Sequence, residues 1–274
     1  MSTQNVTLLA SLPMYDLPEV RRETDALWAL LAFHMREAGV KDVPGRLNRD
    51  DPFEALWLNP DLLVSQSCGL PLMRSYRQTL RPVATPVYRV EGCDGPDYSS
   101  AILVSSASTL SAVEELRGKV CAVNSPQSQS GYNAMRSAVA PLAREGRFFS
   151  AVRVTGSHRI SISAVAAGEA DVCAVDCVTY ALLARYAPES IAGTRVLGFT
   201  PRGPGLPLVV RADLKTDQFE RIRSALRQAM ADPEGREVRA ALYIDGVVET
   251  GIDDYRPVLE MEAQANGLGY AELR

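Results

Sequence analysis

Residues 119–132 decide the fold class, and they read Lys-Val-Cys-Ala-Val-Asn-Ser-Pro-Gln-Ser-Gln-Ser-Gly-Tyr. The apolar run at the start predicts a buried strand. The polar loop after it is followed by apolar side chains at helical spacing, which are Tyr132, Met135, Val139 and Leu142. A strand, a polar loop and a helix in this order are typical of α/β proteins.

The same alternation of strand and helix patterns extends over the whole chain. Strands are predicted at 6–12, 62–64, 83–90, 98–105, 148–155, 171–175, 195–200 and 206–211, and helices at 18–38, 70–80, 109–116, 158–167, 177–186 and 255–265. Apolar spacing at 219–230 predicts another helix, and the remainder after 211 is expected to be helical.

This order predicts an α/β fold of two lobes, each a mostly parallel sheet flanked by helices. Lobe 1 is expected to be discontinuous, at 1–104 and 195–274, and lobe 2 is expected as an insertion at 105–194. Two hinge crossings would join the lobes, and ligands of such proteins bind in the cleft between them.

Composition excludes several classes of function. The 274 residues carry a net charge of -4 with no basic stripe, which argues against a nucleic-acid partner. No stretch has the roughly 18 apolar residues of a membrane span, so membrane insertion is not expected. The start lacks the basic region of a secretory signal, so either the protein is cytoplasmic or a leader has been removed. No cofactor is predicted, and a monomer is expected.

Five cysteines give no disulfide framework, because their number is odd and their density low. Cys121 and Cys173 lie in apolar runs and are expected to be buried. Cys173 and Cys177 lack a nearby histidine and are a poor zinc signal. Cys68 and Cys93 lie in glycine-containing loops, where they would be either separate thiols or a disulfide pair.

The loop at 124–132 suits an oxyanion. The hydroxyls of Ser128 and Ser130 would add donors to the unpaired N–H groups of a helix start, and Gly131 would let a ligand approach the backbone. The alternative is that one serine simply caps the helix.

A second and a third helix start carry polar side chains as well. His158 follows Ser157 in the first turn of a helix, where the helix dipole favours a neutral imidazole. Asp176 ends a buried strand, with Thr179 one turn further on. It is predicted to be a helix cap, a partner for His158 or an acceptor for a protonated ligand group.

Other strand ends are predicted to line the facing wall of the cleft. Tyr15 follows the first strand, Gln66 and Cys68 follow the second, and Tyr98 begins a crossing. The two tyrosines would be aromatic walls with hydroxyl donors.

These motifs resemble a known family, the phosphate/phosphite/phosphonate-binding component of ABC importers, which has a type II periplasmic-binding-protein fold. The resemblance rests on Asn124-Ser125-Pro126-x-Ser128-x-Ser130-Gly131-Tyr132, on the segment from Gly156-Ser157-His158 to Ala170-Asp171-Val172, on Asp176-x-Val178-Thr179, on Tyr98-Ser99-Ser100 and on residues 255–263. It covers nearly the whole chain.

The resemblance implies a non-catalytic receptor for a phosphonate, phosphate or related oxyanion, located in the periplasm and working with an ABC permease. It implies that Ser128, Ser130 and Gly131 form the oxyanion loop, that His158 and Asp176 are the inner histidine and acid, and that Tyr15 and Tyr98 are the aromatic wall. Gln129, also expected at the ligand, replaces a residue that is more usually apolar or small.

Two other functions compete with this one. An enzyme on the same fold would use His158 with Asp176 or Cys177 as an acid–base or nucleophile pair, although no nucleophile elbow, phosphate-binding lysine motif or metal cluster is present. A sensory module would act through a protein partner, because no basic helix-turn-helix is present.

Overall fold

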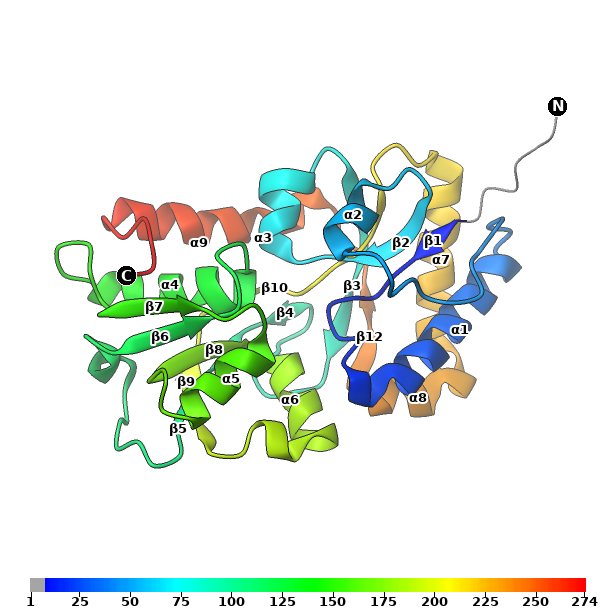
Figure 1. The fold of residues 1–274 in the computed structure, drawn as a ribbon. Helices are drawn as coiled ribbons and strands as arrows, with labels where there is room; N and C mark the ends of the chain where they lie inside the picture. The colour runs from blue at the N-terminus through cyan, green and yellow to red at the C-terminus, as the bar shows by residue number, and fades with distance from the viewer. Residues whose placement is uncertain (1–7) are drawn as a thin grey trace. The chain divides into compact units, whose positions relative to one another are not determined.

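Two five-stranded sheets organise the chain, and the structure, a computed structural model, describes residues 8–274 (Figure 1). The first unit comprises the described residues up to Arg89 together with Gly205–Asp254. The second comprises Val90–Pro204 and Tyr255–Arg274. The chain therefore passes from one unit to the other three times.

The sheet of the first unit has the strand order β1-β2-β11-β3-β12. Its strands are β1 (Leu9–Ala10), β2 (Leu62–Gln66), β3 (Leu80–Tyr88), β11 (Leu208–Arg211) and β12 (Ile244–Val248). The helices are η1 (Pro18–Val20), α1 (Arg21–Glu37), α2 (Phe53–Leu58), α3 (Gly69–Pro71), η2 (Leu72–Tyr76), α7 (Thr216–Ala231), η7 (Pro233–Gly235), α8 (Arg236–Ala241) and η8 (Ile252–Tyr255). Helices α1 and α7 contact each other, and each has a buried apolar face, with Leu31 and Met35 on α1 and Phe219 and Ile222 on α7.

The main sheet of the second unit has the order β7-β6-β8-β5-β9. Its strands are β5 (Ser100–Ser105), β6 (Val120–Val123), β7 (Ala151–Val154), β8 (Val172–Asp176) and β9 (Thr194–Phe199), and β4 (Asp97–Tyr98) pairs separately with β10 (Gly203–Pro204). The helices are η3 (Val113–Leu116), η4 (Gln129–Asn133), α4 (Ala134–Val139), η5 (Ala140–Leu142), α5 (His158–Ala166), α6 (Cys177–Tyr186), η6 (Pro188–Ser190) and α9 (Arg256–Gly267).

The unit boundaries differ from the predicted 105 and 195. Strands β5 and β9, expected to lead into and out of the inserted lobe, both pair within the sheet of the second unit. The C-terminal helix α9, expected in the first lobe, contacts α4 (Figure 1). Ala265, Tyr270 and Leu273 are buried in the core of the second unit. Burial of this apolar face places the tail there.

The sheets are mixed, not mostly parallel as predicted. Parallel pairing is confined to β1 with β2 and to β6 with β7 and β8, whereas β5, β9, β11 and β12 pair antiparallel. Strands joined by helical crossovers run parallel. In the second unit, β6, β7, β8 and β9 follow one another through helices and run in one direction, whereas β5 runs opposite to β8 and β9. In the first unit, β11 and β12, which follow the chain's return to this unit, run antiparallel to β3.

Three local predictions also need correction. Residues 244–248 form strand β12 in a region expected to be helical. The helix expected at 109–116 is only the short η3. The first strand, expected at 6–12, is β1 at Leu9–Ala10, and residues 6 and 7 lie outside the described part of the chain. None of the helices within residues 8–274 combines the length and apolar character needed to cross a bilayer.

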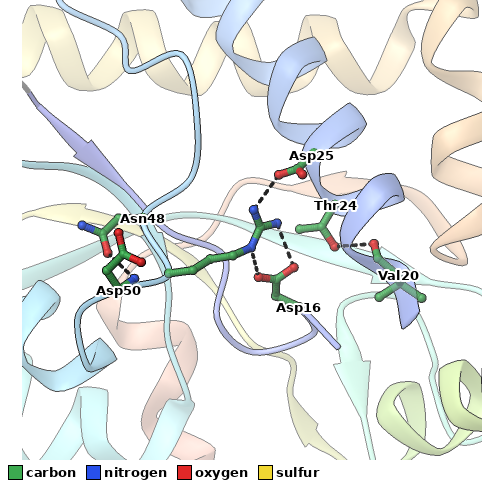
Figure 2. A network of polar contacts seen from close by, with 7 residues as sticks. Asp16, Val20, Thr24, Asp25, Asn48 and Asp50 are labelled. Carbon is green, nitrogen blue, oxygen red and sulfur yellow. Dashed lines mark hydrogen bonds and ion pairs between the residues drawn. The ribbon is translucent and has the colours of Figure 1, made fainter. Parts of the chain in front are cut away.

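An ion-pair network connects the loop before α2 to helix α1 and to the loop that follows β1. The Arg49 guanidinium donates from Nη2 to Asp16 Oδ1 at 3.0 Å and from Nη1 to Asp25 Oδ1 at 2.7 Å, and its Nε bonds the second Asp16 oxygen (Figure 2). This fork-shaped contact joins the loop after β1, helix α1 and the loop at 39–52. Only a planar guanidinium can serve both carboxylates in this way.

We expect Arg49→Lys to lower the free energy of unfolding of the chain by about 1–2 kcal/mol, because one ammonium cannot replace the fork. Urea denaturation followed by circular dichroism measures this change. Arg46→Lys, the same substitution at a nearby exposed arginine, should leave the urea midpoint unchanged. Equal midpoints for the two variants would show that the network adds nothing to stability.

Candidate ligand-binding site

The serine-containing turn lies at the start of η4, in the second unit. The Ser128 hydroxyl accepts a hydrogen bond from Gly131 N at 3.0 Å, so Ser128 caps the helix. The Ser128 carbonyl accepts from Asn133 N at 3.0 Å, five residues on, as in a π-helix. Widened turns of this kind are frequent at functional sites. Ser128 is thus a cap as well as a candidate ligand donor, since its hydroxyl proton can point either to Ser130 Oγ or to a ligand.

Gly131 allows this turn to sit close to the end of β6. A Cβ added at Gly131 would overlap Asn124 Oδ1 and would lie 3.2 Å from His158 Cε1. The Asn124 side chain was not among the predicted site residues, although it opens the quoted loop. Its Oδ1 is buried and has no hydrogen-bond partner among the described residues. A buried polar atom left unpaired at this point favours a site that a ligand completes.

Ser130 and His158 form the polar centre of the turn. Ser130 Oγ lies 2.9 Å from His158 Nε2 and 3.4 Å from Ser128 Oγ. His158 begins α5, which Ser157 caps by accepting a hydrogen bond from Ile160 N. The two helix starts that the sequence singled out are therefore joined by a direct side-chain contact.

His158 is neutral at pH 7. Burial lowers the pKa of its imidazole to about 4 from the ordinary 6.5, and the backbone of Ala174 offsets this only in part. The residue as a whole is half-buried, but Nδ1 is buried, and the Ala174 carbonyl does not reach hydrogen-bonding geometry with it. The sequence predicted a neutral histidine from the helix dipole, and the structure gives desolvation as the larger cause.

Asp176 and the start of β5 flank this centre. Asp176 is buried and caps α6, because its Oδ1 accepts from Val178 N at 2.8 Å and Thr179 N at 3.0 Å. Asp176 is opposite Ser100 in the antiparallel pair of β8 and β5. The Ser100 hydroxyl in turn donates to the Ser130 carbonyl at 3.0 Å. The structure therefore confirms the capping role of Asp176. Ser100 of β5 connects its position in β8 to the turn at Ser130.

Tyr98 lies with this group. It was expected on the wall opposite the turn, but the structure places it in the second unit, buried in β4 and two residues before Ser100. The reason is that β5, which follows it, belongs to the second sheet.

The Gln129 side chain is buried inside the second unit, between η4 and α9. Its Nε2 donates to the Met261 sulfur at 3.3 Å, and its Oε1 accepts from Asn133 Nδ2 at 2.8 Å. Asn133 Nδ2 also donates to the Val258 carbonyl at 3.1 Å, and Arg136 Nη2 donates to Asn133 Oδ1 at 3.1 Å. This buried network attaches η4 to α9, so Gln129 positions the turn.

The three predicted residues of the first unit lie near its strand ends. Tyr15 packs edge-on against Tyr88 with ring centroids 5.2 Å apart. Gln66 is buried at the end of β2, and its Nε2 donates to the Leu206 carbonyl at 3.3 Å. Cys68 is half-buried and precedes α3. Their part in ligand binding stays a prediction.

Of the two alternatives that the sequence left open for Cys68 and Cys93, the structure supports separate thiols. Cys68 and Cys93 belong to different units, and all five cysteines, each in the described range, are thiols. Cys177 Sγ lies 3.5 Å from Cys93 Sγ, and hydrogen bonding to Cys93 together with burial raises the pKa of the Cys177 thiol. An activated thiolate nucleophile needs a lowered pKa, so the structure does not support the enzymatic alternative. Within residues 8–274, no three histidine, cysteine or acidic side chains cluster as metal ligands.

Two α/β units with polar, capped helix starts at one sheet edge define a solute-binding protein of the periplasmic-binding type II class. The family model described as "ABC transporter, phosphonate, periplasmic substrate-binding protein" matches residues 61–255, and the chain belongs to that family. The resemblance stated from the sequence is thereby confirmed. This family is the binding component of ABC transporters, and such binding components work with permeases.

Solved structures support the same fold. The binding-protein component of an ABC phosphonate transporter from Pseudomonas aeruginosa is 17% identical, with a TM-score of 0.72 over 96% of this chain and 87% of that chain. PhnD1 from Prochlorococcus marinus, in complex with methylphosphonate, is 16% identical, with a TM-score of 0.72 over 96% and 99%. XAC2383 from Xanthomonas citri, bound to ATP, is 17% identical, with a TM-score of 0.68 over 96% and 98%. A search of curated proteins found no match.

We expect Gly131→Ala to destabilise the chain by about 1–3 kcal/mol, because the new methyl group overlaps the Asn124 side chain and crowds the His158 ring, so a side chain or the turn must shift. Thermal unfolding measures the change. The control is Gly198→Ala, in β9 of the same unit, where an added Cβ meets no atom within 4 Å. If both variants unfold at the same temperature, the close packing at Gly131 is not a constraint.

The low pKa of His158 predicts a pH-dependent stability. Between pH 6.5 and about 4 the unfolded chain binds a proton at this ring and the folded chain does not, so stability falls as the pH is lowered through this interval. We expect His158→Asn to reduce that fall by about 1–3 kcal/mol. Urea midpoints of both proteins at pH 7, 5.5 and 4.5 test this. Parallel pH profiles would contradict the neutral, buried ring.

Proposed function

We propose that this protein binds a small phosphonate or related oxyanion through the turn Ser128–Gly131 and His158 of its second unit. The observation that supports this most strongly is the 2.9 Å contact between Ser130 Oγ and His158 Nε2, next to a capped helix start. Hydroxyl protons and the first N–H groups of a helix are donors suited to an anion.

The neutral state of His158 favours a ligand of moderate charge. Ser130 donates its hydroxyl proton to an oxyanion when His158 Nε2–H bonds the Ser130 oxygen. Asp176 is paired with Ser100, whose hydroxyl bonds the Ser130 carbonyl, and two like charges in one polar site are costly. The site therefore favours an oxyanion that also carries a protonated hydroxyl or an ammonium group.

The anionic ligands of two similar structures, methylphosphonate and ATP, agree with an oxyanion receptor. The family's role then gives the biological context: a periplasmic protein that captures the solute and presents it to an ABC permease. Retention of ligand by the second unit would be the first step of that delivery.

Calorimetric titration of the full chain with phosphate, phosphite, methylphosphonate and aminoethylphosphonate tests the proposal. We expect at least one of these to bind. Ser130→Ala should weaken that binding by about tenfold or more, because a donor to an anion is worth at least 1.4 kcal/mol. Preference for aminoethylphosphonate would support a role for Asp176.

Ser163→Ala is the matched control, because Ser163 is exposed on α5, the helix that His158 begins. It should bind as the unmodified protein does. If none of the four compounds gives a heat of binding while circular dichroism shows a folded protein, the phosphonate assignment is wrong. Equal affinity for Ser130→Ala and Ser163→Ala would place the ligand elsewhere.

A further inference from the structure

Two thiols distant in sequence face each other in the second unit. Cys93 and Cys177 are 84 residues apart, and their sulfurs lie 3.5 Å from one another. A disulfide has an S–S length of about 2.05 Å, so the two sulfurs must approach by about 1.5 Å for the bond to form. The proposed oxyanion site does not use either sulfur.

The backbones on both sides of the pair are held in place by Ser99. The Ser99 hydroxyl donates to the Gly92 carbonyl at 2.9 Å, and the Ser99 carbonyl accepts from Cys177 N at 3.1 Å. Gly92 has a positive φ of 97°, and a Cβ there would lie 3.0 Å from Cys177 Cβ. Only glycine fits between the turn and the helix, so the approach of the two cysteines is built into the backbone.

Metal binding does not account for the pair. Zinc requires about four ligands, and the described chain shows no third histidine, cysteine or acidic side chain in a cluster with these two. The family is periplasmic, and the periplasm is a compartment in which disulfides form and persist.

We propose that Cys93 and Cys177 are a disulfide site, which closes when the protein meets an oxidising disulfide compound. The Cys93 thiolate attacks one sulfur of the oxidant, releasing one thiol and forming a mixed disulfide. The Cys177 thiolate then attacks Cys93 Sγ and releases the second thiol. The two cysteines together lose two protons and two electrons, which the oxidant takes up as it is reduced to two thiols.

The order of these steps follows from exposure. Cys93 is half-buried and Cys177 is buried, so the oxidant reaches Cys93 first. The hydrogen bond with Cys93 is the largest cause of the raised pKa of Cys177. Formation of the mixed disulfide changes that hydrogen bond and makes the Cys177 thiol easier to ionise.

The disulfide would join the segment where the chain enters the second unit to the start of helix α6. Cys93 lies shortly after the chain enters the second unit at Val90, and Cys177 is the first residue of α6, directly after Asp176. A cross-link across 84 residues restricts the unfolded chain strongly and should raise the unfolding temperature by several degrees. It would also hold the start of α6, where Asp176 acts as the cap.

The test uses the full chain incubated with glutathione disulfide and then denatured for thiol counting. The count should fall from five to three, and a proteolytic digest should contain one peptide pair joined through Cys93 and Cys177. The unfolding temperature should rise, and dithiothreitol should reverse all three changes. Five remaining thiols, or a joined pair with any other cysteine, would overturn the proposal.

Two variants act as controls. Cys93→Ser should keep its four remaining thiols and show no rise in unfolding temperature on oxidation. Cys68→Ser, which removes the half-buried cysteine of the first unit, should still lose two thiols. If Cys93→Ser loses two thiols as readily, the disulfide is formed by other residues. The peptide map of the unmodified protein decides the matter even if a variant folds poorly.

Discussion

The close approach of η4 to the end of β6 is the constraint on which the site depends. At Gly131 the backbone is so near Asn124 and His158 that no side chain fits. This approach sets the distance between Ser130 and His158, because both helix starts are built on the same edge of the sheet. A looser turn would leave two serines and a histidine as separate surface groups.

The turn is kept in position from behind by buried polar side chains. Gln129, Asn133 and Arg136 bond one another, the sulfur of Met261 and the backbone of α9. Such a network stabilises only when its members are satisfied, which makes its geometry specific. The chain's C-terminal helix is therefore part of the scaffold of the site. This explains why residues 255–274 belong to the second unit although almost all of that unit precedes them.

Burial favours the uncharged form of both titratable side chains that the sequence singled out beside Asp176, which are His158 and Cys177. Desolvation keeps His158 uncharged, so it can position a serine hydroxyl without adding a fixed charge. The hydrogen bond with Cys93, together with burial, raises the pKa of the Cys177 thiol, so Cys177 is not an activated catalytic thiolate while it contacts Cys93. Both side chains therefore stay uncharged in the folded protein.

The sequence by itself determined the alternation of strands and helices, the polar helix starts of η4, α5 and α6, and the family, because these depend on local spacing and on short motifs. Helix α6 spans the predicted residues 177–186. Only the tertiary structure decided the unit to which Tyr98 and α9 belong, the inward direction of Gln129, and the pairing of Cys93 with Cys177. Strand direction, side-chain orientation and contacts over 84 residues depend on which apolar faces are buried together. No local pattern contains that information.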